Sequence, residues 1–219
     1  MKKIYKLALE ITRKCNLNCK HCLRGPSENK DMSYETLYET LKNIDEITYV
    51  CFTGGEPTLN LDAIKNFIEI CREFPIRVDN FHITTNGKKY SQELVDLCEE
   101  MYFNFCYDGD SFLCVSRNKY QNEDLGETPN GYMDLSYYSD SQYKLGDRDW
   151  DILKMGNAET FGVREIPQEK LDTDGETIYG EMYVNVNGYI ISGCDWSYEI
   201  QEKLKCGSVY NWDDFVSNL

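Results

Sequence analysis

The sequence is poor in histidine and in positive charge, and it lacks long apolar runs. Of its 219 residues two are histidines, and 23 lysines and arginines stand against 38 aspartates and glutamates, for a formal net charge of −15. Such a charge repels phosphate backbones and anionic lipid, so neither nucleic acid nor a membrane surface is expected as a partner. No apolar run approaches the roughly 20 residues that span a bilayer.

The sequence also lacks the pattern of an N-terminal signal peptide. Two lysines follow Met1, but Glu10 and alternating polar residues interrupt the apolar character that such a segment needs. We therefore expect a cytoplasmic protein. The length favours one domain with a small C-terminal appendage.

Cysteine, in contrast, is plentiful, with ten residues. In a small secreted chain this number would indicate disulfides, but without a secretory signal clustered cysteines favour metal binding. Cys15, Cys19 and Cys22 lie within eight residues on the loop that follows an expected strand. Five others are scattered among apolar residues, and we expect them to be buried thiols: Cys51, Cys71, Cys98, Cys106 and Cys114.

The three clustered cysteines are one ligand short of a four-coordinate metal site. Structural zinc uses four ligands, usually in paired C-x2-4-C knuckles, and the sequence has no second knuckle. A thiol cluster without metal is another alternative, although a polar loop is a poor place for core cysteines. Iron–sulfur clusters are normally held by four cysteines. Three would leave one iron open to an exogenous ligand, which favours chemistry at that iron.

Alternating strand and helix patterns predict a parallel α/β sheet. We expect strands at residues 4–12, 49–53, 81–85 and 103–107. We expect a helix capped by Ser33 with Leu37, Leu41, Ile44 and Ile47 on one face, and further helices at residues 61–74 and 91–101.

Each expected strand ends in a polar or glycine-rich signature. The first runs into the cysteine loop, the second into Gly54-Gly55-Glu56-Pro57, the third into Thr84-Thr85-Asn86-Gly87 and the fourth into Asp108-Gly109. Ligands of such sheets bind at the carboxyl ends of the strands, so the four signatures should line one mouth.

The second half of the sequence has a weaker pattern. Residues 132–138 and 158–166 are expected as strands, and residues 181–186 and 189–192 as a hairpin. Asn187-Gly188 between the hairpin strands indicates a type I′ turn. A boundary near residues 167–175 divides the chain into residues 1–170 and a small extension, residues 171–219.

The cysteine loop, with the ring of His21 just before its last cysteine, resembles the signature loop of the radical S-adenosylmethionine (SAM) superfamily. Gly54-Gly55-Glu56-Pro57 resembles the GGEP motif of the same superfamily. The resemblance covers about residues 1–115 well. It implies a partial (β/α)6 radical SAM barrel in residues 1–170 and a [4Fe-4S] cluster held by Cys15, Cys19 and Cys22, with SAM on the open iron.

The resemblance also implies SAM contacts. Gly54 and Gly55 would let the backbone approach the methionine part of SAM, beside Pro57, and Glu56 would accept hydrogen bonds from its ammonium group. The backbone around His21 would face the adenine. Further contacts to ribose, methionine or substrate are expected from Thr85, Asn86 and Asp108. The electron would come from a flavodoxin- or ferredoxin-like donor, and a 5′-deoxyadenosyl radical would take hydrogen from the substrate.

The segments around Cys194 and Cys206 loosely resemble the SPASM region of peptide-modifying members. Two cysteines cannot hold a four-iron auxiliary cluster alone, so an auxiliary cluster is not expected. We expect modification of a peptide or small protein. The alternatives are radical rearrangement of a small molecule, as in 7-carboxy-7-deazaguanine synthase, a glycyl-radical activase, and a non-catalytic iron–sulfur or zinc protein.

Overall fold

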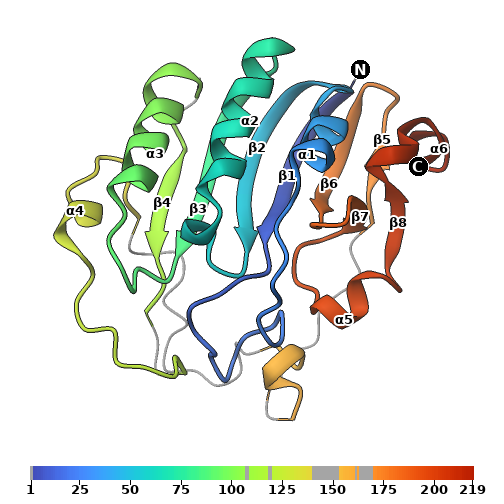
Figure 1. The fold of residues 1–219 in the computed structure, drawn as a ribbon. Coiled ribbons are helices and arrows are strands. Elements are labelled where there is room, and N and C mark those ends of the chain that lie inside the picture. The colour runs from blue at the N-terminus through green and yellow to red at the C-terminus, as the bar shows by residue number, and fades with distance from the viewer. Residues whose placement is uncertain (1, 107–108, 118–119, 140–152, 161, 163–169) are drawn as a thin grey trace.

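The computed structural model describes residues 2–106, 109–117, 120–139, 153–160, 162 and 170–219. These residues form one sheet in the order β4-β3-β2-β1-β6-β7-β8, with β5 paired to β6 (Figure 1). The strands are β1 (Lys2–Thr12), β2 (Ile44–Gly54), β3 (Arg77–Thr85), β4 (Phe112–Val115), β5 (Asp172–Thr173), β6 (Thr177–Val184), β7 (Tyr189–Ser192) and β8 (Lys205–Ser208). The helices are α1 (Tyr34–Leu41), α2 (Leu61–Glu73), α3 (Gln92–Asn104), α4 (Asn130–Met133), α5 (Tyr198–Gln201) and α6 (Trp212–Ser217).

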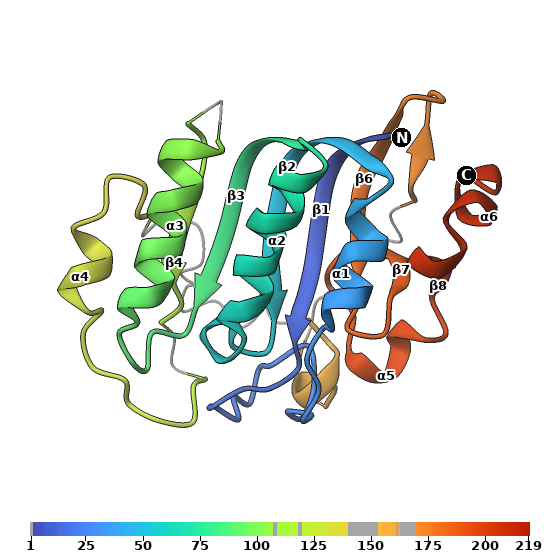
Figure 2. The ribbon, with the colours of Figure 1, turned by 45° about the horizontal axis from the view of Figure 1, so that its top comes forward.

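The central strands of the sheet are parallel. β1 pairs in parallel with β2 and with β6, β2 with β3, and β3 with β4, whereas β5, β7 and β8 pair antiparallel. The predicted α/β class with a parallel sheet is confirmed. Since these strands point the same way, the loops that leave β1, β2 and β3 gather at one edge of the sheet (Figure 2).

Helices α1, α2 and α3 cover one face of the sheet (Figure 1). Leu7, Val50 and Ile83 belong to the apolar core of the protein and are fully buried. Phe52 of β2 meets Phe67 of α2 edge to face, with ring centroids 5.1 Å apart. Because strand side chains alternate between faces, the intervening residues of each strand point to the face opposite these helices.

The first helix is shorter than predicted. Ser33 caps it as expected, because its Oγ accepts a hydrogen bond from the Thr36 amide at 3.0 Å. The helix ends at Leu41, and Ile44 and Ile47 belong to β2 instead. Their helical spacing was misleading because β2 pairs with β1 from Ile44 onward, which buries both isoleucines in the sheet.

The fourth strand lies later in the chain than predicted. Residues 103–107 are not a strand in the described part of the chain: α3 runs to Asn104, and the Phe105 and Cys106 amides still donate to the Met101 carbonyl oxygen. Cys106 makes one isolated bridge to Val78. The strand is Phe112–Val115, whose fully apolar sequence pairs with β3.

The predicted hairpin of β6 and β7 is confirmed, but its turn is not type I′. Gly188 has a φ of 78°, and Asn187 is not among the residues with positive φ, whereas a type I′ turn needs positive φ at both central residues. The Gly188 amide donates to the Asn185 carbonyl oxygen at 2.9 Å. The Asn185 side chain accepts from the Asn187 and Tyr189 amides, which stabilises this alternative turn.

The chain between β4 and β5 differs from the expected strands. Residues 132–138 contain the end of α4 and a single bridge from Tyr138 to Leu113. The expected strand at residues 158–166 lies largely outside the described residues, and its start belongs to a 3-10 turn, Gly156–Ala158. The division at residue 170 remains a proposal about chain organisation, since β6, β7 and β8 extend the same sheet.

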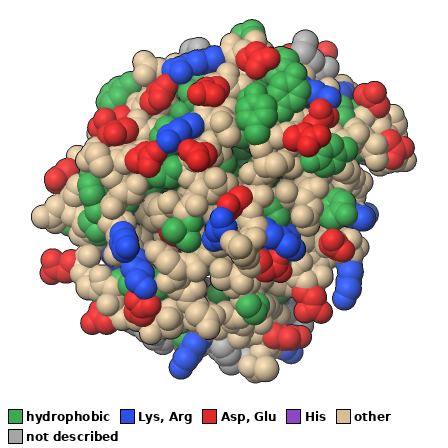
Figure 3. Space-filling model, viewed as in Figure 1, with side chains coloured by type: hydrophobic (Ala, Val, Ile, Leu, Met, Phe, Trp, Pro, Cys, Tyr) green, Lys and Arg blue, Asp and Glu red, His purple; other side chains and the backbone are tan. Residues whose placement is uncertain are grey.

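The helix-covered face carries acidic and basic side chains interspersed with one another (Figure 3). The net charge of −15 is therefore not concentrated in one acidic patch on this face. No helix in the described ranges is long and apolar enough to cross a membrane.

Two matched substitutions test the corrected elements. Ile47→Ala removes a fully buried side chain of β2 and should lower the free energy of unfolding by about 2–5 kcal/mol. Phe103→Ala, at a position that is 70% exposed, should cost less than about 1 kcal/mol. Urea unfolding measures both, and equal losses would contradict this placement of Phe103.

Candidate SAM and cluster site

The three clustered cysteines lie on the loop that leaves β1 at the edge where the strands end (Figure 1). All three are partly buried and none is in a disulfide. Burial, together with the neighbouring Cys22 and Cys15 thiols, raises the pKa of Cys19 to about 11. Burial also raises the pKa of Cys15, with a smaller contribution from Cys22. Negative charge on one of these thiols therefore disfavours ionisation of the others.

The two glycines of the GGEP segment fix the cysteine loop against β2. The Gly55 amide donates to the Thr12 carbonyl oxygen and the Glu56 amide to that of Lys14, both at 2.8 Å. A Cβ on Gly54 would lie 2.0 Å from the Thr12 oxygen, and one on Gly55 would lie 2.1 Å from the Lys14 oxygen. Glycine is thus required here by the protein's own backbone, whereas the sequence suggested an approach to SAM.

The Glu56 carboxylate joins the GGEP segment to the segment after β3. It is 1% exposed and accepts hydrogen bonds from Thr85 Oγ1 at 2.6 Å and the Asn86 amide at 2.8 Å. The amide and hydroxyl of Thr58 donate to the same carboxylate, in the 3-10 turn that begins at Pro57. Protein donors reach both oxygens, so the carboxylate orders the pocket wall, and its expected contact to the ammonium group of SAM stays a prediction.

Two asparagines, Asn86 and Asn157, donate hydrogen bonds to the cysteine loop. Asn86 Nδ2 donates to Asn16 Oδ1 at 2.7 Å, within the loop. The Asn157 amide donates to the Cys22 carbonyl oxygen and Asn157 Nδ2 donates to that of Cys19, both at 2.9 Å. The backbone of the cysteine loop is thus positioned by residues distant in sequence. Sequence reasoning noted a loose resemblance of residues 155–158 to the end of the barrel but missed this role of Asn157, because its partners Cys19 and Cys22 are distant in sequence.

A cavity of about 350 Å³ brings the strand-end segments together. Its walls include most of the predicted site residues and several that were not predicted. The full lining is Cys15, Leu17, Cys19, His21, Cys22, Leu23, Arg24, Cys51, Phe52, Thr53, Gly54, Gly55, Glu56, Thr84, Thr85, Asn86, Ser116, Gln121, Cys194 and Asp195. Pro57 is not in the lining, and Asp108 lies outside the described residues.

His21 packs at the rim of this cavity against Tyr120, with ring centroids 5.7 Å apart. The Lys20 amide donates to the Tyr120 carbonyl oxygen at 3.1 Å, which holds the backbone beside His21. Burial lowers the pKa of His21, so its imidazole is neutral at pH 7.

The sheet face opposite helices α1, α2 and α3 carries polar groups that the sequence reasoning missed. Glu181 pairs with Lys6 at 2.5 Å and accepts a hydrogen bond from the Cys194 amide at 2.9 Å. Burial raises the pKa of Cys51 to about 11, and Glu181 adds to the shift. The sequence signal that could have predicted this second face is the alternation along β2. There Tyr49, Cys51 and Thr53 alternate with Val50 and Phe52.

A buried network fastens the start of the cysteine loop to the C-terminal segment. Glu10 is fully buried and accepts hydrogen bonds from Arg13 Nε at 2.7 Å, from Gln201 Nε2 at 2.8 Å and from the Tyr183 hydroxyl. Arg13 donates in addition to Gln201 Oε1 at 2.7 Å and to Glu28 Oε2 at 3.0 Å. Glu10 and Arg13 thus each have hydrogen-bond partners besides one another, which offsets the cost of burying an ion pair.

The cysteines fit an iron–sulfur cluster better than a single ion. Among the described residues, no three His, Cys, Asp or Glu side chains are close enough to hold one metal ion, which argues against zinc. Cysteines on a cubane cluster bind different irons and need not converge on one point. Cys206 lies exposed on β8 and Cys194 lines the cavity, so these two are not grouped as an auxiliary site.

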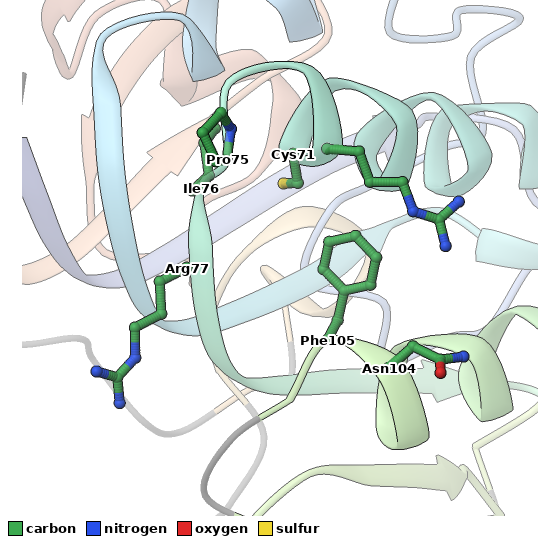
Figure 4. A pocket seen from close by; sticks show the side chains of 7 residues that line it. Cys71, Pro75, Ile76, Arg77, Asn104 and Phe105 are labelled. Atoms are coloured by element: carbon green, nitrogen blue, oxygen red, sulfur yellow. The ribbon is translucent and has the colours of Figure 1, made fainter.

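A second cavity, of about 570 Å³, lies at the opposite edge, where β3 begins (Figure 4). Cys71, Pro75, Ile76 and Phe105 line it together with two arginines, Arg72 and Arg77. The arginines pair with Glu100 and Asp79. This cavity has none of the strand-end signatures, so its larger size does not make it the site.

Comparison with known proteins agrees with this geometry. Residues 9–107 match the profile of the radical SAM superfamily. Residues 9–107, a little under half of the chain, are thus similar to a radical SAM domain. The match begins within β1 and includes the cysteine loop, the GGEP segment and the segment after β3. The radical SAM superfamily uses a [4Fe-4S] cluster and SAM, which agrees with the two predicted cofactors, and the activity of this chain is a proposal.

Relatives resemble the same N-terminal part of this chain. It is 31% identical over 99 residues to an uncharacterized protein of Methanocaldococcus jannaschii, covering 43% of this chain and 35% of the relative. It is 35% identical over 106 residues to GTP 3′,8-cyclase of Aliarcobacter butzleri, covering 43% and 32%. The chain thus spans about a third of the length of these relatives.

A solved structure shares the fold over nearly the whole chain. The chain superposes on native anSMEcpe with bound AdoMet and Cp18Cys peptide with a TM-score of 0.56, at 11% identity. The likeness covers 98% of this chain and 80% of the other. The shared fold therefore includes β6, β7 and β8 as well as the region of the family match.

Gly55→Ala tests the contact between the GGEP segment and the cysteine loop. The new Cβ would displace the Lys14 backbone, so we expect a loss of about 1–3 kcal/mol in unfolding free energy and less iron per chain after anaerobic reconstitution. Gly126→Ala is the control, because its Cβ meets nothing within 4 Å and costs about 1 kcal/mol of backbone strain. Full iron content in Gly55→Ala would contradict the contact.

Glu56→Gln tests the carboxylate that joins the two segments. The Gln amide nitrogen cannot accept a hydrogen bond, so Thr85 or Asn86 loses its acceptor, at about 1–3 kcal/mol of stability. Urea unfolding measures this loss, and SAM titration of the reconstituted protein should show weaker binding. Glu123→Gln, which removes an exposed pair with Lys88, should cost less than about 1 kcal/mol. Equal stability of the two variants would sink this role for Glu56.

Proposed function

We propose that this protein cleaves SAM reductively and uses the resulting 5′-deoxyadenosyl radical to modify a peptide or small protein. The observation that best supports this proposal is that one cavity is bounded by the three cysteine thiols, the Gly54-Gly55-Glu56 segment and Thr85-Asn86. The bound cofactors supply the radical chemistry, and the protein positions them and limits access of water.

Each wall of the cavity has a proposed task. Cys15, Cys19 and Cys22 hold the cluster, and the backbone of Gly54 and Gly55 borders SAM, fixed in place by its bonds to the cysteine loop. Glu56 acts indirectly, by setting the positions of Thr85 and Asn86. The backbone beside His21 borders the adenine. Pro57 only starts the 3-10 turn that places Glu56, and the role of Asp108 stays a prediction.

The C-terminal segment supports a substrate larger than SAM. Cys194 and Asp195, which follow β7, line the same cavity as the cysteine loop. The solved structure that shares this fold over 98% of the chain holds a peptide. A net charge of −15 suits a neutral or basic peptide. The SPASM likeness of residues 171–219 and a flavodoxin- or ferredoxin-like electron donor belong to this proposal.

The second candidate function is a radical reaction of a small molecule. The 35% identity to GTP 3′,8-cyclase over 106 residues favours it, although the identity covers 43% of this chain. From another class, a non-catalytic iron–sulfur protein would need the cysteines but no SAM pocket. The ordered wall built by Glu56, Thr85 and Asn86 speaks for catalysis.

Reductive SAM cleavage without added substrate tests the catalytic proposal. The protein is reconstituted anaerobically with iron and sulfide, reduced with dithionite and given SAM, and 5′-deoxyadenosine is measured. Cys19→Ala should abolish both the cluster absorbance and the product, because only two cysteines of the loop remain, too few to hold the cluster. Cys98→Ala, at a fully buried thiol of α3 away from the cavity, should retain both. A wild-type protein that holds a cluster and makes no 5′-deoxyadenosine would refute catalysis.

A further inference from the structure

Arg24 is a buried cation at the wall of the cavity. It is 8% exposed, follows the last cysteine of the loop by two residues, and lines the cavity together with Cys194 and Asp195. Its guanidinium lies over the Tyr183 ring, 4.8 Å from the centroid. The C-terminal segment therefore contacts Arg24 through the Tyr183 ring and the Trp196 carbonyl oxygen.

The hydrogen-bonding capacity of Arg24 is mostly unused. Of its five N–H donors, one makes a hydrogen bond in the described part of the chain, from Nη1 to the Trp196 carbonyl oxygen at 2.8 Å. No carboxylate of the described residues lies within ion-pair distance of it. Arg13, buried in the same loop, differs: its Nε, Nη1 and Nη2 all donate to oxygen atoms, two of them on Glu10 and Glu28.

A buried guanidinium that no carboxylate contacts is costly, and the cost is offset when an oxyanion binds it. The acidic groups in the cavity wall do not serve this purpose. Both oxygens of Glu56 accept from protein donors, and Asp195 forms no ion pair with Arg24. The remaining donors of Arg24 are therefore available to a ligand in the cavity.

The charge of the cavity wall indicates which oxyanion fits. Arg24 is the one lysine or arginine among the described lining residues. A di- or triphosphate would need several cations, whereas a carboxylate matches one guanidinium through two parallel hydrogen bonds. The net charge of −15 disfavours a strongly acidic ligand.

We propose that Arg24 is a specificity-determining residue that binds a single carboxylate of the substrate, from an Asp or Glu side chain or the C-terminus of an otherwise neutral or basic peptide. This inference rests on the proposed function and deepens it, since it names the group by which the peptide is held. It also separates the peptide from a nucleotide, because one guanidinium does not match a polyphosphate.

The test is a binding experiment that needs no turnover. Reconstituted wild-type protein with SAM is incubated with three pools of N-acetylated random hexapeptides, and bound peptides are separated by ultrafiltration and identified by mass spectrometry. The first pool contains Asp and Glu and is C-terminally amidated. The second contains Asn and Gln in their place, and the third has a free C-terminal carboxylate without Asp or Glu. The first and third pools show which carboxylate is used.

We expect wild-type protein to retain carboxylate peptides over the amide pool by about tenfold or more, as for other charge-assisted recognition. Arg24→Gln should lose this preference, and Arg24→Lys should keep part of it. Arg72→Gln, at the cavity of the opposite edge, should behave as wild type. The comparison of acid and amide pools on wild-type protein needs no variant. It therefore tests the carboxylate preference even if Arg24→Gln folds poorly.

Three results would overturn the proposal. Equal retention of the acid and amide pools by wild-type protein removes its basis, as does an unchanged preference in Arg24→Gln. Loss of the cluster or of SAM affinity in Arg24→Gln, measured by iron content and SAM titration, would show that Arg24 balances the charge of the cofactors. GTP binding that depends on Arg24 would assign it to a phosphate. The assay of 5′-deoxyadenosine tests the proposed function separately.

Discussion

The site depends on the pairing of β1 with β2 continuing past the ends of the strands. The amides of Gly55 and Glu56 bind the carbonyl oxygens of Thr12 and Lys14, so the chain that enters the cysteine loop lies against the GGEP segment. Two Cβ atoms would break this contact, which explains the two adjacent glycines without reference to any ligand. The cysteine loop is thereby anchored to the rigid centre of the sheet, where a cofactor site gains precision from its scaffold.

Beyond this contact, buried carboxylates rather than apolar packing hold the segments around the cavity in position. Glu56 joins the segments after β2 and β3, and Glu10 joins β1 to Arg13, Tyr183 and Gln201. Each carboxylate is buried and fully hydrogen-bonded, so each specifies one arrangement of its neighbours. Glu10 in addition brings the C-terminal segment to the cavity. Residues far apart in sequence thus form one wall around the proposed cofactors.

Much of the fold follows from local pattern, and the errors have physical causes. The carboxyl-end signatures and the central strands were predictable because a parallel sheet places like ends together. Ile44 and Ile47 satisfied a helical spacing, but pairing with β1 placed them in β2. Phe103 looked like a strand residue because aromatic residues favour strands, yet α3 continues to Asn104 and leaves its ring exposed.

The sequence by itself determined the class of chemistry, because three cysteines on one loop and a GGEP segment after the next strand are local features that need no partner. Only the tertiary structure showed that the Glu56 carboxylate accepts hydrogen bonds from Thr85 and Asn86. It also showed that Arg24 is buried at the cavity without a carboxylate partner among the described residues. Whether a charged side chain is satisfied depends on neighbours brought from distant segments, and spacing along the chain does not specify these neighbours.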